Sequence, residues 1–100
     1  MEDSLTVRLV ANAIVSFCQP ERIIMFSRKL SLSGELSSFK LCIVVNTDDK
    51  QSLLHRLYVE VDSDVPYDLV LYTPDEWNAL LPMENSFAAR ISRTGVLLHG

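Results

Sequence analysis

The chain has 100 residues, of which 48% are hydrophobic, with three glycines and four prolines, a composition that indicates one folded domain over residues 1–100. Its formal net charge of -4 argues against a nucleic-acid-binding surface, which needs a basic stripe to displace phosphate counterions. No apolar run approaches the roughly 18 residues that span a bilayer, and the N-terminus is acidic where a signal peptide is basic. We therefore expect a cytoplasmic protein with no membrane or nucleic-acid partner.

An amphipathic helix is predicted first, over residues 4–18, with Asp3 or Ser4 as its N-cap and Pro20 beyond its end. Apolar residues recur there at three- and four-residue steps. Two inward faces fit this spacing. The residues concerned are Leu5, Leu9, Ala13 and Phe17, or alternatively Val10 and Ile14.

Two strands are predicted next, at 22–26 and 39–46, because both segments contain continuous apolar runs. The residues between them, 27–37, hold four serines and Gly34. Such a composition favours a loop, and a short helix at 28–32 is the alternative.

A second helix is predicted from Thr47, which would serve as its N-cap. Asp48 and Asp49 then lie in the first turn, where the helix dipole favours negative charge. The expected apolar face consists of Leu53, Leu54, Leu57 and Tyr58. A third strand is predicted at 66–73.

The clearest local signal is the sequence Thr-Pro-Asp-Glu at 73–76. Thr73 is a typical N-cap, Pro74 suits the first helical position, and Glu76 lies three residues after the cap, where it completes a capping box. A helix is therefore expected to begin here and to end before Pro82.

A last helix is predicted over 84–94, with Gly95 in a left-handed conformation at its end and a short strand after it. Its inward residues are expected to be Phe87, Ala88 and Ile91. The resulting order is helix, strand, strand, helix, strand, helix, helix, strand. This order predicts an α/β or α+β domain with one mixed sheet and helices packed on its faces.

Four segments, in this order, resemble the minimal nucleotidyltransferase domain of the DNA polymerase beta superfamily. They are PERIIMFSRK at 20–29, SSFKLCIVV at 37–45, YDLVLYTPDEWNAL at 67–80 and SFAARISRTGVLLHG at 86–100. The resemblance implies a nucleotidyltransferase-like fold. In that family a Gly-Ser loop holds a triphosphate through backbone amides, and three carboxylates on two adjacent strands hold the metal ions.

This chain departs from the family pattern at the phosphate-binding turn. Phe26 stands where the family has glycine, whereas Ser27 and Arg28 match the family's next two residues. A phenylalanine side chain hinders the close approach of backbone to phosphate that glycine permits.

The departure is larger at the metal-binding positions, which are occupied by Ser38 and Lys40, and only Asp68 retains the family's acid. Lys40 would put a positive charge where a divalent cation should bind. Glu35, in the preceding loop, is a possible but poorly placed substitute ligand. The three positions are therefore interpreted as vestigial, with no catalytic residues, no bound metal and no cofactor.

A protein-binding or regulatory role is the leading hypothesis, because an inactive domain of this kind can keep the interface of an antitoxin-like partner of a helical HEPN-type protein. A positive mean hydropathy of +0.17 also suggests a surface that binds a protein partner or a second copy. Trp77, Met83 and Phe87 are the candidate contacts, with ordinary core packing as the alternative.

Two other hypotheses stay open. The first is nucleotide binding through Ser27, Arg28 and Lys40, with the lysine replacing the charge of the metal; Arg28 and Lys29 are alternatively simple surface charges. The second is a residual Mg²⁺-dependent transferase that moves a nucleoside monophosphate from a triphosphate to an acceptor hydroxyl. The cysteines, Cys18 and Cys42, are predicted to be reduced and buried.

Overall fold

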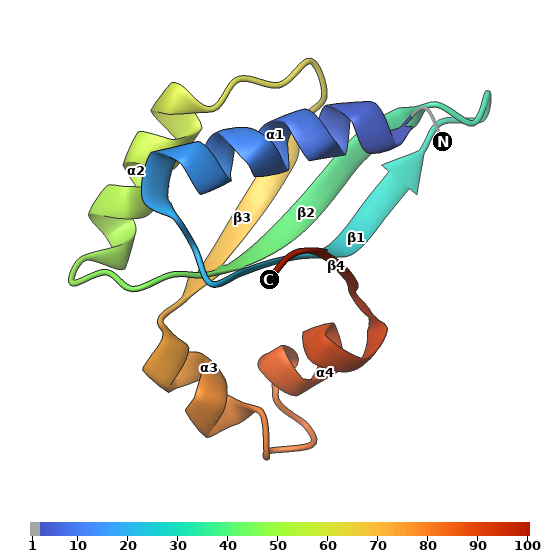
Figure 1. The fold of residues 1–100 in the computed structure, drawn as a ribbon. Coiled ribbons are helices and arrows are strands. Elements are labelled where there is room, and N and C mark those ends of the chain that lie inside the picture. The colour runs from blue at the N-terminus through green and yellow to red at the C-terminus, as the bar shows by residue number, and fades with distance from the viewer. Residues whose placement is uncertain (1–2) are drawn as a thin grey trace.

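The computed structural model describes residues 3–100, whose helices and strands follow the predicted order (Figure 1). The elements are α1 (Asp3–Cys18), β1 (Arg22–Leu30), β2 (Leu36–Val44), α2 (Lys50–Glu60), β3 (Tyr67–Tyr72), α3 (Pro74–Leu80), α4 (Phe87–Thr94) and β4 (Val96–His99). Over the described residues they form one α+β domain around a mixed four-stranded sheet, which confirms the predicted class. No helix in this part of the chain is long and apolar enough to cross a membrane.

The sheet has the strand order β3-β2-β1-β4. β1 runs antiparallel to both of its neighbours, whereas β2 and β3 run parallel. Parallel neighbours require a crossover connection, which α2 provides. The sheet therefore ends in β3 on one side and in the short strand β4 on the other.

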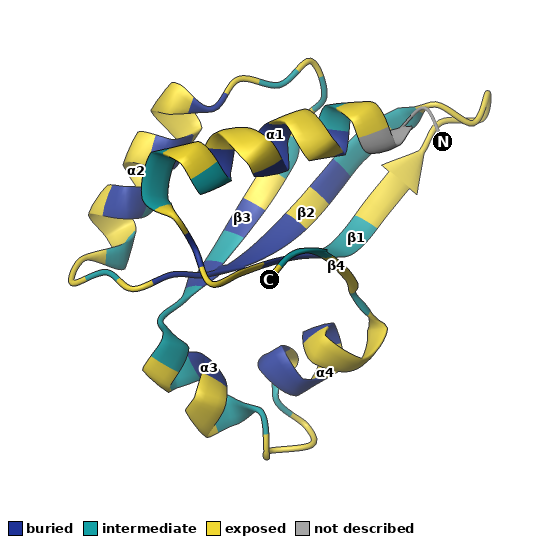
Figure 2. Ribbon diagram, viewed as in Figure 1, coloured by how far each residue is buried: buried dark blue, intermediate teal, exposed yellow. Residues whose placement is uncertain are grey.

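Helices cover the two faces of the sheet unequally, with α1 and α2 on one face and α3 and α4 on the other (Figure 1). Successive residues of β2 alternate between the two cores, so that Leu41 and Ile43 pack with α1 and α2, and Cys42 and Val44 pack with α3 and α4. The second face is covered only in part, since Lys40 on β2 and Asp68 on β3 are exposed. Figure 2 shows exposed positions within both strands.

α1 packs on the sheet through one of its two possible faces. Val7, Val10 and Ile14 are buried, whereas Leu5 and Leu9 are 66% and 61% exposed. The alternative built on Val10 and Ile14 is therefore confirmed, and the one built on Leu5 and Leu9 is wrong. Asp3 and Ser4 are already helical residues, so the expectation that one of them is the N-cap is wrong.

The loop predicted at 27–37 is mostly strand. β1 continues to Leu30, β2 begins at Leu36, and only the residues between them form a turn, in which the Ser31 N–H donates to the Glu35 carbonyl at 2.7 Å. Gly34 supplies the positive φ of 88° that this turn needs. The cross-strand hydrogen bonds of the hairpin outweigh the turn preference of the serines, and the alternative helix at 28–32 does not form.

α2 begins two residues later than predicted. Asp49, not Thr47, is the N-cap, and its carboxylate accepts the Ser52 N–H at 3.0 Å. The acids at 48 and 49 therefore precede the first turn. Leu53 and Leu57 are buried as expected, whereas Tyr58 is 41% exposed.

The capping box of α3 is confirmed. The Thr73 hydroxyl accepts the Glu76 N–H at 3.2 Å, and the Glu76 carboxylate accepts the Thr73 N–H at 2.9 Å. The same carboxylate accepts from Lys50 Nζ at 2.9 Å and so joins α3 to α2.

α4 begins at Phe87 with Ser86 as N-cap, later than the predicted start at residue 84. Ala88 and Ile91 are buried as expected, whereas Phe87, the first residue of the helix, is 43% exposed. Gly95 is extended, with φ -79° and ψ 166°, and the predicted left-handed conformation is wrong.

Candidate functional site

The three vestigial positions lie on one face of two neighbouring strands. Lys40 on β2 and Asp68 on β3 are register partners, and Ser38 lies two residues before Lys40, on the same side of the strand. Lys40 and Asp68 are exposed and Ser38 is half-buried. At these positions the structure therefore pairs one lysine with one aspartate on neighbouring strands.

No group of three or more histidine, cysteine, aspartate or glutamate side chains that could hold a metal ion occurs among the described residues. Glu35, the predicted substitute ligand, belongs to the hairpin turn. There its carboxylate accepts from Ser33 Oγ at 3.5 Å, and its backbone N–H donates to Ser31 Oγ at 3.2 Å. These contacts keep Glu35 within the turn.

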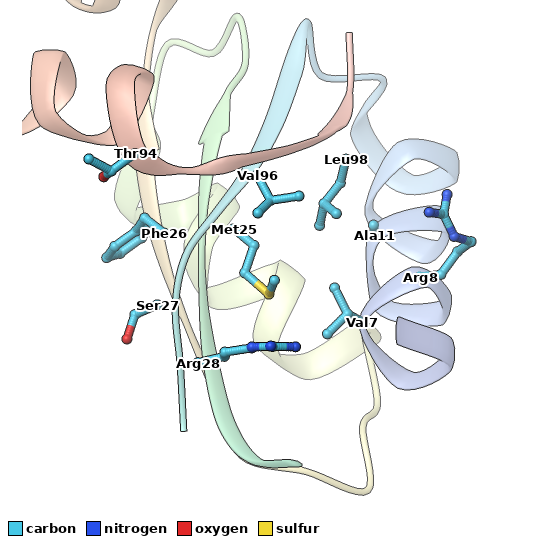
Figure 3. Close-up of a pocket in the computed structure, with 10 residues that line it drawn as sticks. All are labelled: Val7, Arg8, Ala11, Met25, Phe26, Ser27, Arg28, Thr94, Val96 and Leu98. Carbon is cyan, nitrogen blue, oxygen red and sulfur yellow. The ribbon is translucent and has the colours of Figure 1, made fainter. Parts of the chain in front are cut away.

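Phe26 lies at an irregularity in β1, where the pairing with β2 skips from Met25 to Ser27. Because of this bulge, Phe26 and Ser27 point to the same side of the strand, away from Met25 and Arg28 (Figure 3). The ring of Phe26 packs edge-on against Phe87 of α4, with centroids 5.2 Å apart. The residue at the expected phosphate-binding turn thus anchors α4 to the sheet.

The structure brings together only two of the three residues predicted to bind nucleotide. Ser27 pairs with Lys40, so these two share the face that also carries Asp68. Arg28 pairs with Phe39, which is buried in the core beneath α1 and α2. Arg28 and Lys40 therefore lie on opposite faces of the sheet.

A cavity of about 430 Å³ lies between α1, β1 and β4 (Figure 3). Its lining is mostly apolar and includes Val7 and Ala11 of α1, Met25 of β1, and Val96 and Leu98 of β4. Arg8 and Arg28 also line it, and the Arg28 side chain extends toward Val7. Sequence reasoning missed this cavity because its walls come from opposite ends of the chain.

The three predicted interface residues differ in their exposure. Trp77 is 4% exposed and belongs to the core beneath α3 and α4, so core packing is the correct interpretation for this residue. Met83 and Phe87 are 58% and 43% exposed, and both remain accessible to a partner.

The two edges of the sheet differ in the contacts that their outer sides make. At the β3 edge, the Tyr58 hydroxyl accepts the Leu69 N–H at 2.7 Å. At the other edge, the pairing between β1 and β4 ends at Met25 and Val96. Among the described residues, β1 therefore has a neighbouring strand on only one side from residue 26 to residue 30, a segment called here the 26–30 edge.

No protein-family model matches the chain, and neither a curated protein nor a solved structure is significantly similar to it. What is established is thus a small α+β domain with a mixed four-stranded sheet and helices on both faces.

Proposed function

We propose that this protein is a catalytically inactive, nucleotidyltransferase-like domain that works by binding another protein, as an antitoxin-like partner of a helical HEPN-type protein. The observation that carries the proposal is the Lys40–Asp68 register pair, with Ser38 beside it. In-line nucleotidyl transfer uses metal ions clamped between several carboxylates. A lysine at the strand position next to the one aspartate of this face puts a positive charge where a metal ion would bind and repels a divalent cation.

The state of the expected phosphate-binding turn supports the same proposal. Residues 26–30 are part of β1, and their pairing with β2 commits this backbone to a sheet. The ring of Phe26, packed on Phe87, fills the space next to the backbone where glycine would leave room. Because Arg28 and Lys40 lie on opposite faces, they do not converge on one phosphate chain.

Exposed apolar side chains support a binding role. Leu32 at the hairpin tip is fully exposed, and Val96 and Leu97 in β4 are each about half exposed. Surface hydrophobics are common singly, but apolar groups on a hairpin tip and on an edge strand are typical of surfaces that a partner covers.

Native mass spectrometry of the tagged protein, purified gently from cells of its natural source, tests the proposal. The expected result is a stoichiometric complex with one helical protein, in place of a free chain of 11.3 kDa. A free monomer as the only species would contradict the proposed role.

An amide NMR titration with ATP and GTP, each with and without Mg²⁺, tests the loss of catalysis. We expect no saturable change at Ser38, Lys40 or Asp68. Saturable, Mg²⁺-dependent shifts at these residues would identify a working metal site and overturn the proposal of an inactive domain.

A further inference from the structure

The 26–30 edge carries a bulge at Phe26 and the charge of Lys29, but among the described residues no further strand lies beside it. Natural sheets block their edges with side chains, bulges or covering elements, because unpaired backbone groups invite another strand. In this protein, the β3 edge has such a device in the Tyr58 hydroxyl. On the opposite edge, β4 covers β1 only as far as Met25, and the chain then turns away at Gly95 into α4.

An added strand at this edge would continue the line of β4. Its side chains would have different neighbours on the two faces of the sheet. Next to Arg28, its side chains would face the α1 side of the sheet, where Val7, Ala11 and Leu98 line a mostly apolar cavity that Arg8 and Arg28 also line. Next to Lys29, they would face the other side, which Lys29 shares with Ser38 and which carries no apolar cover at this end. Because side chains alternate between the two faces along a strand, apolar residues are favoured at those positions of the added strand that face the cavity.

Charged residues near the edge determine which side chains are favoured at the other positions of the added strand. Lys29 lies in the 26–30 edge and its register partner on β2 is the uncharged Ser38. On the same face Lys40 stands next to Asp68, and Arg8 lines the cavity from α1. This local excess of basic residues stands out in a chain whose formal net charge is -4. Acidic side chains on the Lys29 side of an added strand would therefore be favoured.

A second copy of this chain is a poor occupant of the same edge. Two 26–30 edges paired about a two-fold axis at Lys29 would place Lys29 of one copy directly opposite Lys29 of the other. Like charges on directly opposed strand residues destabilise pairing.

We propose that the 26–30 edge docks an extended, acidic segment of a partner protein, which joins the sheet next to β1 and continues the line of β4. Alternate apolar side chains of that segment enter the cavity between α1 and β4, and the acidic ones face Lys29. The inference rests on the proposed protein-binding function and names the kind of segment recognised. Binding of this kind draws its affinity from main-chain hydrogen bonds and its specificity from alternate side chains.

The test uses a blocked hexapeptide of alternating valine and glutamate, titrated into the full-length ¹⁵N-labelled protein. Saturable amide shifts are expected for residues 26–30, with smaller shifts at Val7, Ala11 and Val96 around the cavity. Addition of the peptide should also slow hydrogen exchange of those β1 amides that point away from β2.

Two further peptides separate the contributions. A peptide of alternating valine and lysine keeps the strand propensity and reverses the charge, and it should bind at least about five-fold more weakly. A valine–glutamate peptide with N-methyl groups on alternate amides keeps both side chains and charge but loses backbone donors. It should produce no saturable shift at the 26–30 edge.

Matched protein variants complete the design. Lys29→Glu should weaken binding of the valine–glutamate peptide at least about five-fold, because attraction becomes repulsion. Arg22→Glu makes the same charge change in the same strand, at the end next to the residues that pair with β4, and should leave the affinity within about two-fold of the unaltered protein. Both residues are exposed, so both variants should fold.

Four results would overturn the proposal: equal binding of the N-methylated peptide, shifts confined to other surfaces, equivalent shifts caused by ATP, or concentration-dependent self-association through residues 26–30. These failures are distinct from a failure of the proposed function. A stoichiometric complex that leaves the amides of the 26–30 edge as they are in the free protein would refute this docking site and leave the protein-binding function standing.

Discussion

Gly95 lies where the end of α4 meets β1, and there is no space for a side chain. A Cβ atom at this position would lie 2.4 Å from Ile24 Cγ2 and 2.7 Å from the Ile91 carbonyl oxygen. The backbone angles themselves are extended and open to any residue. Glycine is thus required here by packing.

Gly95→Ala is expected to lower the free energy of unfolding by about 1–3 kcal/mol, because the Ile91 oxygen belongs to the helix backbone and cannot move aside. Urea denaturation measures the loss. Gly34→Asn is the matched control, since no atom lies within 4 Å of the added Cβ and asparagine tolerates a positive φ. A loss for Gly95→Ala no larger than that of the control would contradict the packing argument.

The two cysteines differ in accessibility and should differ in reactivity. Cys42 is fully buried, and burial raises the pKa of its thiol to about 12. Burial also raises the pKa of the Cys18 thiol, but this residue is only half-buried. In the folded protein, iodoacetamide should slowly modify one thiol per chain, and unfolding should release the second. Intact-mass analysis measures the number of modified thiols per chain. The Cys18→Ala variant should remain unlabelled until denaturant is added. Labelling of that variant before denaturation would show that Cys42 is accessible.

At the scale of elements, local signals were reliable where one side chain determines a boundary. The capping box at Thr73 and Glu76 fixes the start of α3 by hydrogen bonds between residues close in sequence. The end of β1 is different, because it depends on pairing with β2, and pairs such as Arg28 with Phe39 are not visible in composition. The serines of this segment therefore predicted a loop that the hairpin ladder replaces.

Glu76 makes the junction of α2 and α3 sensitive to acid. The hydrogen bond from the Thr73 backbone N–H, and then the bond from Lys50, hold the pKa of Glu76 below its usual value. A lowered pKa in the folded state gives stability that is present above the unfolded pKa of about 4.3 and is lost as the pH falls through the folded pKa. The melting temperature of the unaltered protein should therefore fall more between about pH 5 and about pH 3 than that of Glu76→Gln, which keeps the cap acceptor.

Glu84→Gln is the control for this comparison, since it removes one carboxylate outside the capping box. Its melting temperature should follow that of the unaltered protein over the same acid range. Parallel acid profiles for Glu76→Gln and the unaltered protein would show that the Thr73 and Lys50 contacts do not contribute.

Tyr58 protects the β3 edge, and its removal should expose that edge. Tyr58→Phe deletes the acceptor of the Leu69 N–H and should cost about 1 kcal/mol in stability while increasing light scattering on storage. Tyr67→Phe is the matched control, because its hydroxyl donates to the Val61 carbonyl at 2.5 Å and leaves the β3 edge unchanged. Equal scattering from both variants would show that edge protection is not the role of Tyr58.

At the scale of the whole molecule, the candidate site was predictable only in part. The adjacency of Lys40 and Asp68 follows from strand alternation and from the resemblance, and the register bears it out. The cavity was not predictable, because Val7 and Val96 meet only when β4 closes beside β1. The same closure leaves the 26–30 edge open, which no local pattern indicated.

Aspartates placed at positions 38 and 40, where the resemblance expects acids, test whether the face around Asp68 has the geometry of a metal site. In the Ser38→Asp, Lys40→Asp double variant, three carboxylates would share one face of adjacent strands, and Mn²⁺ should bind with a dissociation constant of about 1 mM. Local paramagnetic broadening of amides near Asp68 measures this binding, and the unaltered protein should show none.

The matched control for the Ser38→Asp, Lys40→Asp double variant is the pair Lys29→Asp, Ser31→Asp. It makes the same charge change on β1 and its turn, on the far side of β2 from Asp68. If the control broadens equally, Mn²⁺ responds to net charge alone. If the double variant keeps its fold and shows no broadening, the strands do not hold the acids in a ligating arrangement. Broadening confined to the double variant would mean that the substitutions at 38 and 40 are what separates this surface from a metal site.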